Sequence, residues 1–94
     1  MSKVYVVFGT TGEYSDYVEW PVCAFADEAL AIRMVELCDG EWRRIKASPE
    51  YNDGIYVTNK YDPDMQTDYT GTRYNYYELE LRDSIDEGDS NEQS

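Results

Sequence analysis

The side chains that most often perform chemistry in proteins are scarce in this sequence, apart from carboxylates. Its 94 residues include no histidine, which argues against histidine-based acid–base catalysis, the usual serine or cysteine triads and the commonest zinc sites. The two cysteines, Cys23 and Cys38, form no CxxC pair. We expect both to be free, buried core residues, because no histidine base is present to activate a thiol.

Carboxylates are abundant, with 20 Asp and Glu residues. On a small domain some pair of them falls at the spacing of a hydrolase site by chance, so their number does not indicate catalysis. Asp62, Asp64, Gln66 and Asp68 alternate as ligands do at the start of a calcium loop, but Thr67 stands where such a loop has glycine. An acidic surface turn is favoured, with calcium as the alternative. We expect no catalytic residues, no cofactor and no metal, and therefore a protein that is not an enzyme.

The segment Gly9-Thr10-Thr11-Gly12 follows a predicted strand, as phosphate-binding loops do. It lacks the lysine of a P-loop and the third glycine of a dinucleotide fingerprint. No helix follows it directly. The segment therefore predicts a hairpin turn.

The formal net charge of −12 is divided between two parts of the chain. Residues 83–94 carry five acidic groups and no basic group, which predicts a disordered acidic tail. Residues 1–82 carry 15 acidic and 8 basic groups, or −7, and are predicted to form a single domain. This acidity disfavours binding to bare nucleic acid or to an anionic membrane.

The pattern of apolar residues predicts an α+β fold of order ββαβ. Strands are expected over 3–9, 17–25 and 72–82, and one long helix over 28–47. The first two strands pair as a hairpin and the last runs antiparallel beside the first. The result is a three-stranded antiparallel sheet of order 2-1-3 with the helix packed on one face.

Individual residues refine these elements. Pro21 removes a backbone donor, which predicts an edge strand or a bulge. Asp27 is expected to cap the helix, and Pro49 follows its end. A break of the helix at Gly40 is the alternative to one continuous helix. Within the irregular segment 49–71, residues 55–57 are expected to form a short strand.

The sheet face away from the helix is predicted to carry Tyr5, Val7 and several tyrosines. Such a face needs a cover. Segment 49–71, a second copy of the chain or a partner protein are the three alternatives.

Ten tyrosines, many beside carboxylates, are the most unusual feature of the composition. Tyrosine provides contact area with a polar tip, and an acidic–aromatic surface suits Arg and Lys of a partner. The alternative is that the tyrosines only cover a sheet face. The predicted partner-binding residues are Glu13, Tyr14, Asp16, Tyr17, Glu19, Tyr61, Asp62, Asp64, Asp68, Tyr69, Tyr76, Glu78 and Glu80.

Four runs, KVYVV at 3–7, GEYSDY at 12–17, FADEALA at 25–31 and YYELEL at 76–81, resemble short phage and prophage proteins of unknown function. The resemblance covers about half of the chain. It implies a phage origin and supplies no catalytic residues. Small acidic phage proteins of this kind often inhibit host defence or nucleic-acid enzymes by occupying their DNA-binding surfaces.

The sequence therefore favours an acidic interaction protein that binds a host protein with a basic, nucleic-acid-binding surface. Its carboxylates would stand in for DNA phosphates, as in an anti-CRISPR or other anti-defence inhibitor. The alternatives are a self-associating phage accessory or structural protein, which would be a homodimer, and a binder that sequesters a small ligand. We expect no secretory signal, because residues 1–3 run directly into a strand, and hence the cytoplasm of a bacterial host.

Overall fold

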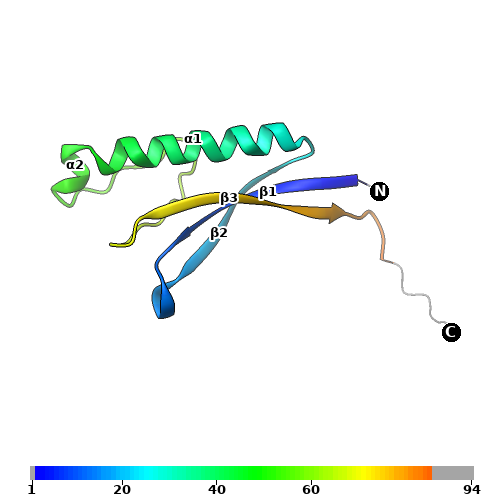
Figure 1. Ribbon diagram of the computed structural model, residues 1–94, viewed down its shortest axis with the longest axis horizontal. Coiled ribbons are helices and arrows are strands. Elements are labelled where there is room, and N and C mark those ends of the chain that lie inside the picture. The colour runs from blue at the N-terminus through cyan, green and yellow to red at the C-terminus, as the bar shows by residue number, and fades with distance from the viewer. Residues whose placement is uncertain (1, 86–94) are drawn as a thin grey trace.

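A computed structural model describes residues 2–85 as a three-stranded antiparallel sheet with one long helix (Figure 1). The sheet order is β2-β1-β3, so the predicted fold class and topology are confirmed. The predicted tail falls mostly on residues 86–94, which lie outside the described residues. The elements are β1 Ser2–Thr11, the 3-10 turn η1 Tyr14–Asp16, β2 Val18–Phe25, α1 Glu28–Lys46, α2 Pro49–Asn52 and β3 Thr72–Leu81.

Local signals explain most of these boundaries. The side chain of Asp27 accepts a hydrogen bond from the backbone N–H of Ala29, 2.9 Å away, and caps α1 as expected. The helix passes through Gly40 without a break. Pro21 lies on an edge strand, and the β1–β2 register shifts beside it, so both forms of that prediction are confirmed.

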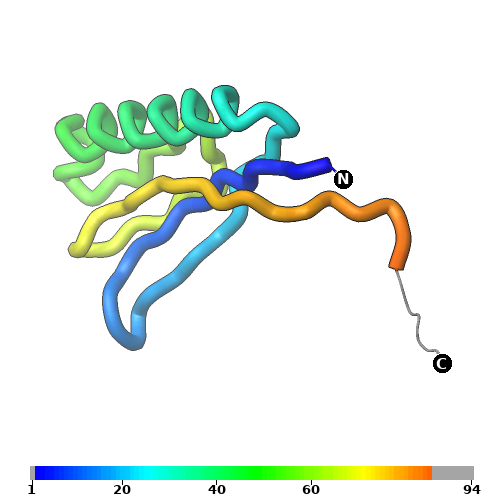
Figure 2. The backbone as a smooth tube through the Cα atoms, turned by 45° about the vertical axis from the view of Figure 1, so that its right-hand side comes forward, coloured from blue at the N-terminus to red at the C-terminus, as the bar shows by residue number. Residues whose placement is uncertain are grey.

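The segment after α1 differs from its prediction. Pro49 is the first residue of the short helix α2, a position that suits proline because the N–H it lacks would have no partner within the helix. The Ser48 hydroxyl caps this helix by accepting from the N–H of Tyr51. The strand expected over 55–57 is wrong, since these residues form no strand. Residues 53–71 instead run back between the helix and the sheet, where the isolated bridge Asn59–Asp62 forms (Figure 2). We call these residues the returning segment.

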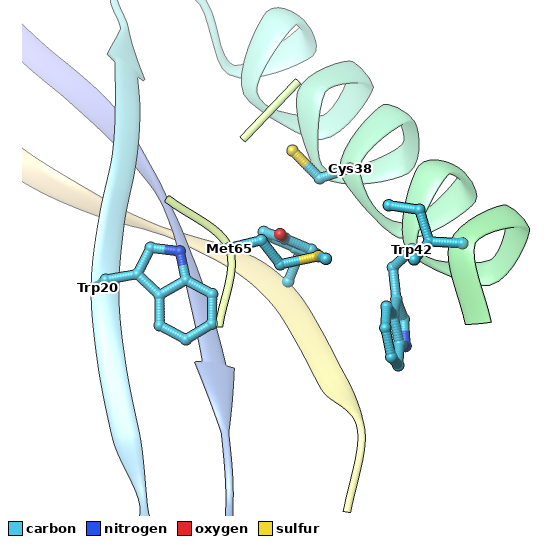
Figure 3. Close-up of a cluster of buried hydrophobic side chains, with 6 residues drawn as sticks. Trp20, Cys38, Trp42 and Met65 are labelled. Atoms are coloured by element: carbon cyan, nitrogen blue, oxygen red, sulfur yellow. The ribbon is translucent and has the colours of Figure 1, made fainter. Parts of the chain in front are cut away.

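The core lies between α1 and one face of the sheet. Figure 3 shows Trp20 of β2 facing Met65 of the returning segment, with Cys38 and Trp42 of α1 beyond it. Tyr74 of β3 completes the cluster and meets Trp20 edge to face, with ring centroids 6.4 Å apart.

The predicted orientation of the sheet is wrong. Val7 is fully buried, and Tyr76, paired with it across β1 and β3, donates from its hydroxyl to Glu28 of α1, 2.8 Å away. The face that carries Tyr5 and Val7 is therefore the covered one. The apolar pattern alone favoured neither side, because β1 is apolar on both faces.

Packing at Gly9 gives a first test of this core. Gly9→Ala is expected to lower the free energy of unfolding by about 1–3 kcal/mol, because the added Cβ would lie 2.6 Å from Cζ2 of Trp20. Gly40→Ala is the matched control. A Cβ at Gly40 would have Nη2 of Arg43 as its nearest neighbour, 3.9 Å away, and alanine within a helix is favoured over glycine by up to about 1 kcal/mol. Urea denaturation of both variants measures the change. An unchanged midpoint for Gly9→Ala would contradict the close contact between Gly9 and Trp20.

Candidate functional site: an acidic–aromatic end of the sheet

The turn between β1 and β2 is fastened to the segment that leads into β3. The N–H of Gly12 donates to the Thr70 hydroxyl at 3.0 Å, and Nη2 of Arg73 donates to the carbonyl of Gly12 at 2.8 Å. The Thr11 hydroxyl donates to the carbonyl of Gly71 at 2.7 Å. These bonds join residues about 60 positions apart in sequence, so they set where the turn lies.

Gly12 is required at this junction for two reasons. Its φ of +84° lies in the left-handed region, which glycine occupies without steric cost. A Cβ at this position would also lie 2.3 Å from the carbonyl oxygen of Asp16. The turn can therefore close tightly against the segment before β3.

The hydrogen bonds between the β1–β2 turn and the segment before β3 bring seven of the predicted partner-binding residues to one end of the sheet. Tyr14 and Tyr69 are 92% and 88% exposed, and Tyr17 is also exposed. We call this group the acidic–aromatic end. It consists of Glu13, Tyr14, Asp16, Tyr17, Glu19, Asp68 and Tyr69.

The carboxylates of this end have no ion-pair partner within the described residues. Among residues 2–85, no ion pair includes any of its four carboxylates. Hydrogen bonds from the hydroxyl and the N–H of Thr70 lower the pKa of Asp68, so this group is ionised at neutral pH. The guanidinium of Arg73 lies nearby, but it bonds to the main-chain carbonyls of Gly12 and Thr70.

Tyr14 is held in a conformation that a tyrosine rarely adopts. Its φ is +53°, and it is the only non-glycine residue with a positive φ among residues 2–85. This conformation costs about 1–2 kcal/mol for an L residue. Within the described residues, the Tyr14 side chain makes no hydrogen bond or aromatic contact that compensates for that cost.

An open depression of about 370 Å³ adjoins this end. Trp42 and Tyr51 form one wall, with ring centroids 5.4 Å apart, and Asp68 and Tyr69 contribute to the lining. Lys46 borders it as well. Aromatic faces beside a carboxylate are suited to a guanidinium or ammonium group.

Three predicted site residues lie elsewhere and have internal partners. Tyr76 bonds to Glu28 on the helix side of the sheet. Glu78 pairs with Lys3 at 2.8 Å, and Glu80 pairs with Arg82 at 3.1 Å. They lie about 14 to 27 Å along β3 from its start at Thr72, next to the acidic–aromatic end, at roughly 3.4 Å per residue. The structure therefore does not bring them into the same group.

Asp62 was assigned to the partner-binding surface, and this assignment is wrong because the residue is 2% exposed. Its Oδ2 accepts from Nε1 of Trp20 at 2.8 Å and from the hydroxyl of Tyr74 at 2.7 Å. Burial, followed by this bond, raises the pKa of Tyr74, so the phenol remains a neutral donor. Asp62 thus has a structural role that its acidic neighbourhood in the sequence concealed.

The remaining predicted residues lie on the same returning segment. Tyr61 is half-buried against the core, with Nζ of Lys60 5.3 Å from its ring centroid. Asp64 is exposed, and no hydrogen bond or ion pair of the described residues links its side chain to the acidic–aromatic end. No group of three or more potential metal ligands occurs among residues 2–85.

The thiols lack the features of nucleophiles. Cys38 is fully buried, and burial raises its pKa to about 12. Burial also raises the pKa of Cys23. Both groups therefore remain protonated thiols at neutral pH, which does not favour cysteine chemistry.

Comparisons with protein-family models, curated proteins and solved structures find no match for this chain. The resemblance to phage proteins therefore stays a prediction. None of the helices formed by residues 2–85 has the length and apolar character needed to cross a membrane.

The structural role of Asp62 is directly testable. Asp62→Asn is expected to lower the free energy of unfolding by about 1–3 kcal/mol, because the amide places a donor where the carboxylate offered only acceptors. Asp64→Asn removes the same charge two positions away on the surface and should change stability by less than about 0.5 kcal/mol. Urea denaturation measures both, and equal effects would show that Asp62 acts only as a surface charge.

Proposed function

We propose that this chain is an interaction protein that binds a basic, nucleic-acid-binding surface of a host protein and inhibits it. The observation that carries the proposal is the grouping of four carboxylates and three exposed tyrosines at one end of the sheet. Ionic contacts and cation–π contacts with Arg and Lys are the interactions such a surface offers.

The absence of ion pairs from this group, among residues 2–85, supports the proposal. At the far end of β3 the chain pairs Glu78 and Glu80 with its own Lys3 and Arg82. The described ion pairs leave the carboxylates of the acidic–aromatic end for other partners. A basic partner would gain ion pairs there without breaking existing ones.

The strained backbone at Tyr14 also supports the proposal. The Tyr14 carbonyl accepts from the N–H of Tyr17 and closes the turn, but the side chain, which is 92% exposed, makes no hydrogen bond or aromatic contact within residues 2–85 to offset the strain. Strain of this kind is concentrated at functional positions. The phage origin and the anti-defence role remain the finer part of the proposal.

Capture from a bacterial lysate tests the proposal when it is combined with competition. The tagged chain is immobilised, and bound proteins are eluted either with short duplex DNA or with a salt gradient. If the surface replaces phosphates, duplex DNA displaces the captured proteins, and binding falls steeply between 50 and 500 mM NaCl. Capture that resists both treatments would contradict phosphate mimicry.

Tyr14→Gly separates binding from folding. We expect it to leave the free energy of unfolding unchanged or to raise it by up to about 1 kcal/mol, because glycine adopts a φ of +53° without strain. At the same time it should weaken capture at least fivefold, because the ring is lost. Ile85→Ala, which also truncates an exposed side chain, is the control and should retain full capture. Full capture by Tyr14→Gly would remove Tyr14 from the interface.

A further inference from the structure

The sheet face opposite α1 is apolar and uncovered. Residues paired directly across two strands share a face, and on this face Val4 pairs with Leu79 and Val6 with Tyr77. Leu79 is 51% exposed, and Tyr77 and Leu81 are similarly accessible. Figure 1 shows α1 on one side of the sheet and no element on the other. The open face consists of Val4, Val6, Phe8, Ala24, Tyr77, Leu79 and Leu81.

No element formed by residues 2–85 covers this face. The helix α1 and the core-forming part of segment 53–71 pack on the opposite side of the sheet. Residues 86–94 read DEGDSNEQS and contain no apolar side chain, so they are chemically unsuited to it. Ile85, which also follows the sheet, is 83% exposed.

The charge of the molecule favours one kind of occupant. The seven residues of the open face are uncharged, although the chain carries 28 Asp, Glu, Lys and Arg residues. The charged residues Glu19 and Arg73, which both pair with Thr10, follow at the end of the same sheet face, beyond Phe8. A basic partner, which the carboxylates elsewhere attract, gains no ion pair from the seven residues of the open face. Two like-charged copies of the chain, in contrast, meet with the least repulsion where neither presents a charge.

We infer that the open face is a homodimer interface in which two copies pack their sheets face to face about a two-fold axis. The same apolar patch then occurs on both sides, as an isologous contact requires. Antiparallel sheets pack in this way about 10 Å apart, with interdigitating side chains.

The size of the face sets the strength of the dimer. Three strands spaced about 4.8 Å apart give the face a width of about 14 Å, and about eight residues at roughly 3.4 Å each give it a length of about 27 Å. The plane of the face therefore measures about 400 Å². Projecting side chains increase the accessible area of each face beyond this value. The planes of two copies total about 800 Å², and side chains add to this, so the interface lies at or below the lower limit of specific interfaces, about 1,200 Å² in total. This size predicts a weak dimer in concentration-dependent equilibrium with the monomer.

Sedimentation equilibrium over a wide concentration range tests this inference. The native chain is expected to shift from the monomer mass to twice that mass, and Leu79→Glu to remain monomeric because it introduces a carboxylate among the apolar residues of the open face. Leu30→Glu is the matched control: Leu30, on α1, is also 51% exposed, and the substitution adds the same charge. It should dimerise as the native chain does.

The remaining outcomes are equally decisive. A native chain that stays monomeric would overturn the inference and leave the face to a different protein, and equal dimerisation of the two variants would place the interface elsewhere. If Leu79→Glu loses its native circular dichroism spectrum, Tyr77→Gln on the same face replaces it.

Salt separates this inference from the proposed function. Each copy carries a net charge of −12, so dimerisation should strengthen as salt screens the repulsion, whereas capture of a basic partner should weaken. A dimer that dissociates on adding salt would contradict an uncharged interface.

Discussion

One buried polar turn, Asn59–Asp62, holds the helix and the sheet in one arrangement. Asn59 is fully buried and donates from Nδ2 to the carbonyl of Cys38 on α1. Asp62 accepts from Trp20 of β2 and Tyr74 of β3. Buried polar groups are costly unless they are hydrogen-bonded, so these partners specify a single position for the returning chain. That position brings Asp68 and Thr70 to the turn after β1.

The same arrangement divides the surface into regions of different chemistry. The returning segment helps to cover one sheet face and leaves the apolar, uncharged residues of the open face without a cover. It also concentrates unpaired carboxylates beside exposed tyrosines at one end. Attraction to a basic protein and self-association therefore use separate surfaces, and salt affects them in opposite directions. Both regions follow from where segment 53–71 packs.

The sequence predicted the features that depend on local chemistry. The helix limits, the cap at Asp27, the edge position of Pro21 and the strand order were all readable from periodicity and residue type. It did not predict which sheet face is covered, because β1 is apolar on both, nor that Asp62 is buried among exposed acidic neighbours. These features depend on long-range hydrogen bonds. The only local signal for the burial of Asp62 was the spacing of Asn59 and Asp62, three residues apart, which is also common in surface turns.

Hydrogen exchange followed by NMR tests most directly whether the returning segment builds the acidic–aromatic end. The Nε1–H of Trp20, bonded to buried Asp62, and the backbone N–H of Gly12, bonded to Thr70, report the two ends of this connection. We predict that both exchange far more slowly than in the unfolded chain, with Trp20 close to the protection of the β1 core amides. Rapid exchange of both protons while the β1 amides stay protected would contradict the account, because the sheet would then fold without fastening the turn.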